Sequence, residues 1–205
     1  MKLYMHPYST NARRATMTAE LCGLPYEKVI IQLQQGEHLK PEYLAINPNH
    51  KVPALVDGDV TLWESNAIAI YLANKAGRGD LWPTDAAAQA DVARWLMWTH
   101  STWSPALGGL VFELLVKVQW RNLPADEAKV AEARASHALN AKLLDDHLAG
   151  KQWVAQDRLT LADVSLACTL GPALMVGVNF DDVPNVGAWF ARVQELPAWK
   201  ATQAL

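Results

Sequence analysis

The spacing of the apolar residues changes near residue 80, and no other feature of the sequence constrains the fold so strongly. Before that point, short β-branched and aromatic runs alternate with turn residues, which is typical of strands joined by tight turns. Beyond it, apolar residues recur at helical spacing in segments 86–118, 124–147, 161–176 and 184–195. The pattern predicts an α/β N-terminal domain followed by an all-α C-terminal domain.

The N-terminal domain has the element order β-α-β, loop, β-β-α. Strands are expected at 2–6, 26–31, 52–56 and 60–63. A single helix, which ends at Gly23, separates the first two strands and favours a parallel βαβ unit with a right-handed crossover. Asp57-Gly58-Asp59 lies between the last two strands, and a D-G pair in that context is a strong hairpin signal. This order is that of a thioredoxin-like domain.

Chain breakers mark the boundary between the two domains. The stretch from Gly77 to Asp85 is rich in glycine, proline and aspartate and is interpreted as a linker. We therefore place the thioredoxin-like domain at 1–77, the linker at 78–85 and the helical domain at 86–205. Within the helical domain, Thr160 and Asp163 form a capping box, which fixes the start of a helix and has a structural meaning.

Composition narrows the class of protein. Hydrophobic residues make up 51% and charged residues 19% of the 205 residues, and no apolar run reaches the roughly 18 residues of a membrane span. The first residues are typical of a strand and show no secretory signal, so we expect a soluble, cytoplasmic protein with no membrane partner. The formal charge is -3 and the longest basic cluster is Arg13-Arg14, which argues against nucleic-acid binding. A small-molecule partner is therefore expected.

Cysteine and histidine usage argues against several chemistries. The two cysteines, Cys22 and Cys168, lie in apolar helical patterns and are interpreted as buried packing residues. The six histidines show no zinc-site spacing, so no metal is expected. His6 lies shortly before Ser9, but no G-x-S-x-G motif supports a serine hydrolase.

The segment around Val52 and Pro53 is a candidate for ligand binding. Pro53 begins a strand although it cannot donate a ladder hydrogen bond. If the Val52-Pro53 bond is cis, the backbone of Val52 faces outward and pairs with an extended, peptide-like ligand. The alternative is an ordinary edge-strand proline, and this segment alone leaves both interpretations open.

Glu64 and Ser65 stand where a strand ends and a helix begins. Ser65 and the free amides of the helix start suit a carboxylate, and Glu64 can hold an ammonium group. The head group of an α-amino acid satisfies both. A capping serine beside a solvated glutamate is the alternative.

Ser9 follows the first strand, at a helix start whose unpaired amides and dipole favour an anion. Its hydroxyl either caps the helix or donates a hydrogen bond to a thiol. A cysteine-like thiol has a pKa of about 8.5, and lowering that pKa by two units requires about 2.7 kcal/mol. A hydrogen bond to a charged group supplies roughly 1.5 to 3 kcal/mol, and a helix N-terminus adds about 0.3 to 1 kcal/mol. Ser9 can therefore stabilise a thiolate without a general base.

Taken together, several stretches of this sequence resemble the glutathione S-transferase family. They are H-P-Y-S-T-N-A-R-R at 6–14, G-E-H at 36–38, N-P-N-H-K-V-P-A-L at 47–55 and E-S-N-A-I at 64–68. The resemblance spans the whole chain, because R-L-T-L-A-D at 158–163 is similar to the family's helical domain. It is closest to the serine-using bacterial, phi-like and theta-like groups, since Ser9 falls where they carry their catalytic serine. Tyr8 and Tyr4 are the alternatives for a tyrosine mechanism.

The resemblance implies which residues bind glutathione. They are His38, Lys51, Val52, Pro53, Glu64 and Ser65. By this resemblance Val52 pairs with the cysteinyl backbone, while Glu64 and Ser65 hold the γ-glutamyl end. His38 and Lys51 meet the glycyl carboxylate, because neutral or positive donors suit that group.

Leu39 departs from the family pattern. Phi-like members often carry a lysine at this position, so the glycyl carboxylate is expected to rest on Lys51, with Lys40 as a further candidate. The contribution of His38 to binding the glycyl carboxylate is expected to be smaller than that of Lys51.

The electrophile site is expected in the helical domain, near the linker. Pro105 and Gly108-Gly109 are expected to bend the first long helix and open an apolar pocket. The residues expected to line it are Trp103, Leu107, Phe112 and Trp120. Trp95 and Trp98 are interpreted as packing residues.

The resemblance implies a homodimeric glutathione transferase. Glutathione is its cosubstrate, Ser9 stabilises the thiolate, and a small hydrophobic electrophile accepts the sulfur. One alternative keeps the site but changes the reaction to a glutathione-dependent peroxidase, disulfide reductase or dehalogenase. Another is a non-catalytic module for protein interaction or ligand storage, although such a module has no need to keep Ser9, Val52-Pro53 and Glu64-Ser65 together.

Overall fold

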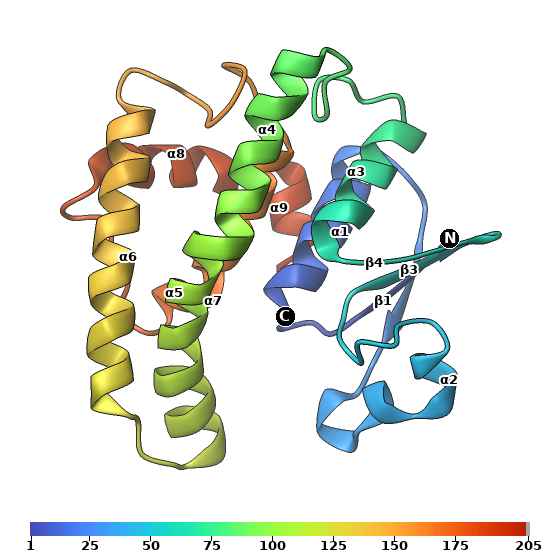
Figure 1. Cartoon of the computed structure of the whole chain (residues 1–205), viewed down its shortest axis with the longest axis horizontal. Helices are drawn as coiled ribbons and strands as arrows, with labels where there is room; N and C mark the ends of the chain where they lie inside the picture. The colour runs from blue at the N-terminus through green and yellow to red at the C-terminus, as the bar shows by residue number, and fades with distance from the viewer. Residues whose placement is uncertain (204–205) are drawn as a thin grey trace. The chain divides into compact units, whose positions relative to one another are not determined.

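The computed structural model describes residues 1–203, which divide into two compact units (Figure 1). The α/β unit comprises Met1–Thr84 together with residues 196–203, and the helical unit comprises Asp85–Glu195. A thioredoxin-like sheet and helix domain followed by a helical domain was predicted from the sequence, and this fold class is confirmed.

One mixed sheet forms the centre of the α/β unit. Within the described residues its strands are β1 (Lys2–Met5), β2 (Glu27–Ile30), β3 (Ala54–Asp57) and β4 (Val60–Trp63), in the order β2-β1-β3-β4. β1 pairs with β2 in parallel, whereas β3 pairs with both β1 and β4 in the antiparallel sense. The predicted βαβ unit and the predicted hairpin are therefore both present.

Two helices cover one face of the sheet. α1 (Thr10–Leu21) and α3 (Ser65–Lys75) lie side by side there (Figure 1). Leu3 of β1 and Leu55 of β3 are fully buried and share an apolar cluster with side chains of both helices. This packing fixes where each helix begins relative to the sheet.

The opposite face carries a second, smaller cluster. Because successive side chains of a strand point to opposite faces, Tyr4 and Ala54 lie on this side, next to Leu3 and Leu55 in the sequence. They pack with Tyr43 of α2 (Pro41–Leu44). Short 3-10 turns precede α2 at η1 (Leu33–Gln35) and η2 (Glu37–Leu39).

The end of the chain returns to the α/β unit. α9 (Pro197–Ala201) packs against α1, where the Arg13 guanidinium carbon lies 3.5 Å from the ring centroid of Trp199 and Arg13 Nη2 donates to the Trp199 carbonyl at 3.0 Å. The sequence placed this segment in the helical domain 86–205, and the structure corrects that assignment for residues 196–203. The remaining positions of that predicted domain, 204–205, lie outside the described residues.

A long helical run opens the helical unit. Its consecutive segments are α4 (Ala86–Trp98), η3 (Thr99–Trp103), α5 (Ser104–Leu110) and η4 (Val111–Trp120). η3 and η4 are π-helical, and in η3 the Ser104 amide donates to the Thr99 carbonyl. Pro105 has no amide hydrogen, and the wider π turn lies directly before it.

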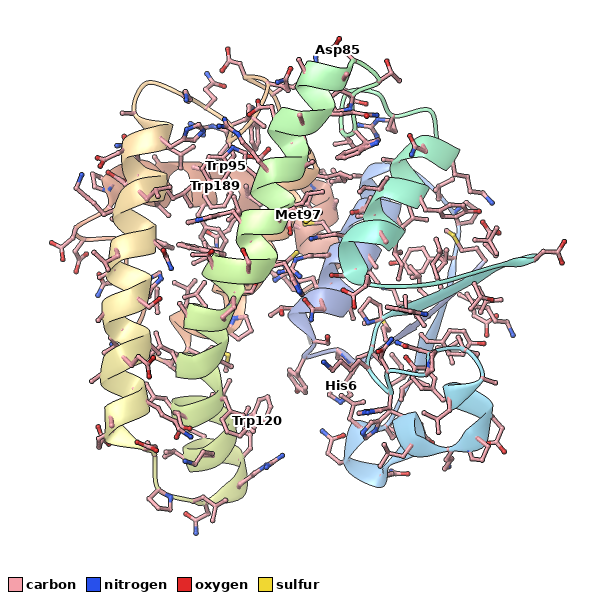
Figure 2. All side chains as sticks on the ribbon, in the orientation of Figure 1. His6, Asp85, Trp95, Met97, Trp120 and Trp189 are labelled. Atoms are coloured by element: carbon pink, nitrogen blue, oxygen red, sulfur yellow. The ribbon has the colours of Figure 1, made fainter. Side chains whose placement is uncertain are left out.

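The remaining helices surround a buried centre. They are α6 (Glu127–Leu148), α7 (Leu161–Leu174) and α8 (Pro184–Gln194). Every residue of α7 from Leu161 to Leu170 is buried, and the buried rings of Trp95 and Trp189 lie between helices of this unit (Figure 2). Across residues 1–203, no helix has both the length and the apolar character that crossing a membrane requires.

Asp163 organises the loop before α7. Its Oδ1 accepts hydrogen bonds from the Val154 amide and from Trp189 Nε1, both at 2.9 Å, and its Oδ2 accepts from the Thr160 amide at 2.9 Å. The predicted capping box of Thr160 and Asp163 is confirmed. Its structural reach is wider than predicted, because the same carboxylate also fixes α8 through Trp189.

Candidate functional site

The register of the sheet brings the candidate segments of the α/β unit to one end. Tyr4 of β1 pairs with Ala54 of β3, and Ala54 in turn pairs with Trp63 of β4. The end of β1, the start of β3 and the end of β4 are therefore neighbours. The chain continues from these points into 6–9, 52–53 and 64–65. His6 marks the first of these segments in Figure 2.

Ser9 is the N-cap of α1. Its Oγ accepts a hydrogen bond from the Ala12 amide at 3.2 Å, and its own amide donates to the His6 carbonyl at 3.0 Å. Because the hydroxyl oxygen acts as an acceptor toward Ala12, its hydrogen stays available for an acceptor outside the helix. The first turn of α1 carries no acidic side chain that would repel an anion. Ser9 therefore both caps the helix and offers a donor.

The Val52-Pro53 peptide bond is cis. Val52 and Pro53 are both buried at the start of β3. The preceding turn is held in place because the hydroxyl of Tyr43 and the side-chain amide of Asn47 both donate to the Lys51 carbonyl. The backbone ahead of β3 is thus fixed by side chains rather than left mobile.

The start of α3 differs from the expected arrangement in which Ser65 is the N-cap residue. Glu64 is the N-cap residue of α3 and Ser65 is the first helical residue. Glu64 has a φ of 73°, which costs a residue other than glycine about 1 to 3 kcal/mol and is typical of functional sites. The Glu64 side chain makes no cap hydrogen bond to α3, and a helix N-terminus of this kind favours an anion.

Arg14 is a residue of this region that the sequence did not single out. In the sequence Arg14 is part of the short basic cluster Arg13-Arg14, yet in the structure it is only 2% exposed. Its Nη1 donates to Ser65 Oγ at 3.3 Å and also to Asn11 Oδ1. Arginine is rarely buried, and no local pattern distinguishes a buried arginine of a helix from an exposed one.

The residues expected at the glycyl end lie in the loops around α2. The His38 ring is 6.5 Å from the His50 ring, and His38 Nδ1 is buried with no hydrogen-bond partner among residues 1–203. Lys51 is exposed. Lys40 stands at the start of α2, with its Nζ 3.9 Å from a carboxylate oxygen of Glu37.

The tyrosines expected as alternatives to Ser9 occupy different positions. Tyr4 packs on the α2 face of the sheet, with its ring 6.0 Å from that of Tyr43. Tyr8 is 56% exposed, and its ring lies 5.8 Å from that of His6. Tyr8 is therefore both the nearer tyrosine to Ser9 in the chain and an exposed one.

The four electrophile-site candidates fall into two groups. Trp103 and Leu107 lie in the interior of the helical unit, where Trp103 Nε1 donates to the Leu166 carbonyl at 3.3 Å and its ring stacks on Trp98. These two are core residues with almost no surface to offer a ligand. Phe112 and Trp120, on η4, are 46% and 51% exposed.

The cysteines offer no obvious nucleophile. Cys168 is fully buried in α7, and burial raises the pKa of the half-buried Cys22 thiol. In the described part of the chain, no group of three histidine, cysteine or acidic side chains is arranged to hold a metal ion.

Comparison with known proteins agrees with the fold. The family model described as glutathione S-transferase, N-terminal domain, matches residues 1–74, and the model of the C-terminal domain matches residues 102–197. Glutathione S-transferase GstB of Escherichia coli strain K12 is 34% identical over 193 residues, which cover 93% of this chain and 91% of that protein. The chain belongs to the glutathione S-transferase family.

Solved structures show the same similarity. Glutathione transferase F2 from Populus trichocarpa matches with a TM-score of 0.91 at 27% identity, over 98% of this chain and 96% of that one. A structure of glutathione S-transferase-I bound with the ligand lactoylglutathione also gives a TM-score of 0.91, at 29% identity over 99% of this chain and 98% of that one. The chain is thus similar to these proteins over nearly its whole length.

Proposed function

We propose that this chain is a glutathione transferase in which Ser9 stabilises the thiolate of bound glutathione for attack on a hydrophobic electrophile. The observation that carries the proposal is the convergence of Ser9, Val52-Pro53 and Glu64-Ser65 at one end of one sheet. A tripeptide with a thiol in its middle and a carboxylate at each end has the chemistry that this set recognises. Family membership supports the same conclusion.

Ser9 supplies the donor for the sulfur. Its hydroxyl hydrogen is not used by the bond to the Ala12 amide, and the start of α1 adds the favourable end of a helix dipole. A charge-assisted hydrogen bond of roughly 1.5 to 3 kcal/mol lowers a thiol pKa by about one to two units. That is enough to make the thiolate a major species near neutral pH.

The ends of glutathione are assigned to the neighbouring segments. The γ-glutamyl carboxylate binds at Ser65 and the N-terminus of α3, with Glu64 beside the ammonium group. Val52 pairs with the cysteinyl backbone ahead of the cis Pro53. The glycyl carboxylate is assigned to the loops that carry His38 and Lys51.

Additional donors support the glycyl assignment. The buried Nδ1 of His38, which has no hydrogen-bond partner within residues 1–203, suits a ligand acceptor. Lys51 adds a positive charge that is exposed to solvent. Lys40 is a weaker candidate, because Glu37 lies within ion-pair distance of it.

Exposed apolar side chains of the helical unit are proposed to bind the electrophile. Phe112 and Trp120 retain this assignment, because both present aromatic surface on η4. Figure 2 shows Trp120 on the last turns of that helix. Trp103 and Leu107 are not part of this proposed surface, because both pack inside the helical unit.

A pair of Ser9 variants tests the proposed function. The wild type should be retained on immobilised glutathione and should conjugate a chlorinated aromatic electrophile. Ser9→Ala should lower the conjugation rate about 10- to 100-fold, since one charge-assisted hydrogen bond is lost. Ser9→Asp keeps an N-cap of equal quality but has no donor and repels a thiolate, so it should be at least as slow while folding normally.

The outcomes separate the alternatives. Undiminished conjugation by both variants would show that Ser9 does not activate the thiol. Retention on glutathione with no conjugation, but with reduction of an organic hydroperoxide or a disulfide, would indicate another reaction at the same site. A wild type that is not retained and is inactive would indicate a non-catalytic module.

We also propose that the protein acts as a homodimer in the cytoplasm, on the strength of the family resemblance. Sedimentation equilibrium over a range of protein concentrations measures the assembly directly. A single species with the mass of one chain, 22.6 kDa, at all concentrations would contradict the homodimer.

A further inference from the structure

Arg14 of α1 places a positive charge inside the α/β unit, directly behind Ser65. The arginine is 2% exposed and the serine 7%, so neither the charge nor the contact between them is solvated. Their Nη1 and Oγ atoms are 3.3 Å apart. A guanidinium is expensive to bury, and it persists in an interior only where hydrogen bonds compensate for lost water.

The chemistry of the two groups fixes the direction of the hydrogen bond. A guanidinium has donors only, so the Ser65 oxygen must be the acceptor in this contact. The hydroxyl hydrogen of Ser65 therefore cannot point at Arg14, and it is left for an acceptor on another side. The Glu64 side chain makes no cap hydrogen bond at the start of α3, and the positive end of that helix favours an anionic acceptor at the same place.

We infer that Arg14 is a positioning residue for the γ-glutamyl subsite: it orients the Ser65 hydroxyl as a donor and adds a buried positive charge behind the ligand carboxylate. The inference rests on the proposed binding of glutathione. Arg14 is too deeply buried to contact the ligand itself, so it acts through Ser65. Asn11, whose Oδ1 accepts from the same Nη1, holds the guanidinium at this position.

The neighbouring Arg13 provides a matched control. It belongs to the same helix, but its guanidinium lies on Trp199 of α9 rather than behind Ser65. Replacing either arginine by methionine removes one positive charge and keeps a long, flexible side chain of similar reach. The two variants therefore differ in which contact is lost.

The test compares two ligands that differ only in the α-carboxylate. Glutathione carries that group, whereas γ-aminobutyryl-cysteinyl-glycine lacks it and is otherwise the same. Calorimetric titration of the full chain with each ligand gives the ratio of their dissociation constants. For the wild type we expect glutathione to bind at least about tenfold more tightly, because a charge-assisted contact is lost with the carboxylate.

Arg14→Met should raise the dissociation constant of glutathione about tenfold or more and leave that of the analogue within about twofold. Arg13→Met should preserve the wild-type ratio. If Arg14→Met weakens both ligands equally, or neither, Arg14 has only a structural role and the inference fails. If the wild type binds both ligands equally, the carboxylate subsite at Ser65 is wrong, and if it binds neither, the proposed function itself fails.

Arg14→Lys keeps the experiment decisive if the methionine variant does not fold. Lysine retains the charge but lacks the planar fork of the guanidinium, so the ratio should fall part of the way toward that of Arg14→Met. Circular dichroism and the melting temperature establish which variants are folded. A folded Arg14→Lys that weakens the binding of both ligands equally would overturn the inference.

Discussion

Removal of the Asp163 carboxylate should be among the most damaging single changes in the helical unit. In Asp163→Ala, the amides of Val154 and Thr160 and Nε1 of Trp189 lose their acceptor in the interior. An unsatisfied buried donor costs about 1 to 3 kcal/mol, so we expect the free energy of unfolding to fall by roughly 3 kcal/mol or more. Urea unfolding followed by circular dichroism measures this loss.

The effect should also depend on pH in a defined direction. Burial raises the pKa of Asp163 to about 6, against the lowering effect of the hydrogen bonds from Val154, Thr160 and Trp189. A carboxyl group whose pKa is higher in the folded than in the unfolded state binds protons more tightly when folded. The pKa of an aspartate in the unfolded state is about 4, so protonation of Asp163 contributes fully to the free energy of unfolding below about pH 4. This contribution is lost as the pH rises through about 6, the pKa of Asp163 in the folded state.

When the pH is lowered from about 7 to about 5, protonation of Asp163 should raise the free energy of unfolding of the wild type by on the order of 1 kcal/mol. Asp163→Ala should not show this increase. The exposed Asp182 provides a control, since Asp182→Ala removes a carboxylate of the same unit at the surface. A loss of stability below about 1 kcal/mol in Asp163→Ala would refute the reasoning about buried donors. An unchanged pH dependence between the wild type and the variant would refute the reasoning about burial.

Other contacts give further predictions. Asp145→Ala removes the acceptor of the Asn185 and Val186 amides at the start of α8, so urea unfolding should show a loss of about 1 to 2 kcal/mol, and an unchanged midpoint would contradict this. Trp199→Leu removes the ring under the Arg13 guanidinium, and it should accelerate hydrogen exchange of α1 amides while amides of α7 exchange as before. Phe112→Ala combined with Trp120→Ala should raise KM for an aromatic electrophile about tenfold and leave the glutathione dissociation constant unchanged; an equal loss for both ligands would argue against the assignment.

Local signals account for much of what the sequence predicts correctly. The D-G pair at Asp57-Gly58 fixes the hairpin because the turn itself requires a positive φ, which Gly58 adopts at 60°. Thr160 and Asp163 fix the start of α7 because a capping box is made within a few residues. Such features depend on near neighbours, so the sequence is enough to find them.

The features that the sequence misses depend on distant contacts. The sequence places residues 196–203 in the helical domain, but the contact of Trp199 with Arg13 ties α9 to the first helix of the chain. Trp103 lies within a helix that also exposes aromatic rings, and its burial is decided by neighbours such as Leu166. The burial of Arg14 behind Ser65 is likewise invisible in a pattern of neighbouring residues.

In the candidate site, too, some features can be predicted from local sequence and others cannot. The sequence indicates Ser9, the Val52-Pro53 turn and the Glu64-Ser65 step, because each has a local chemical reason. It does not indicate the positive φ of Glu64, which makes Glu64 rather than Ser65 the residue before the first turn of α3.

The pKa of the thiol of bound glutathione tests the central claim most directly. Ultraviolet absorbance of the thiolate, followed against pH in the complex, gives this value for the wild type, Ser9→Ala and Ser9→Thr. We predict a thiol pKa about two units below that of free glutathione in the wild type and in Ser9→Thr, which keeps the hydroxyl, and a rise of about one to two units in Ser9→Ala. The same low thiol pKa in all three proteins would contradict the account, because the hydroxyl of Ser9 would then play no part in ionising the thiol.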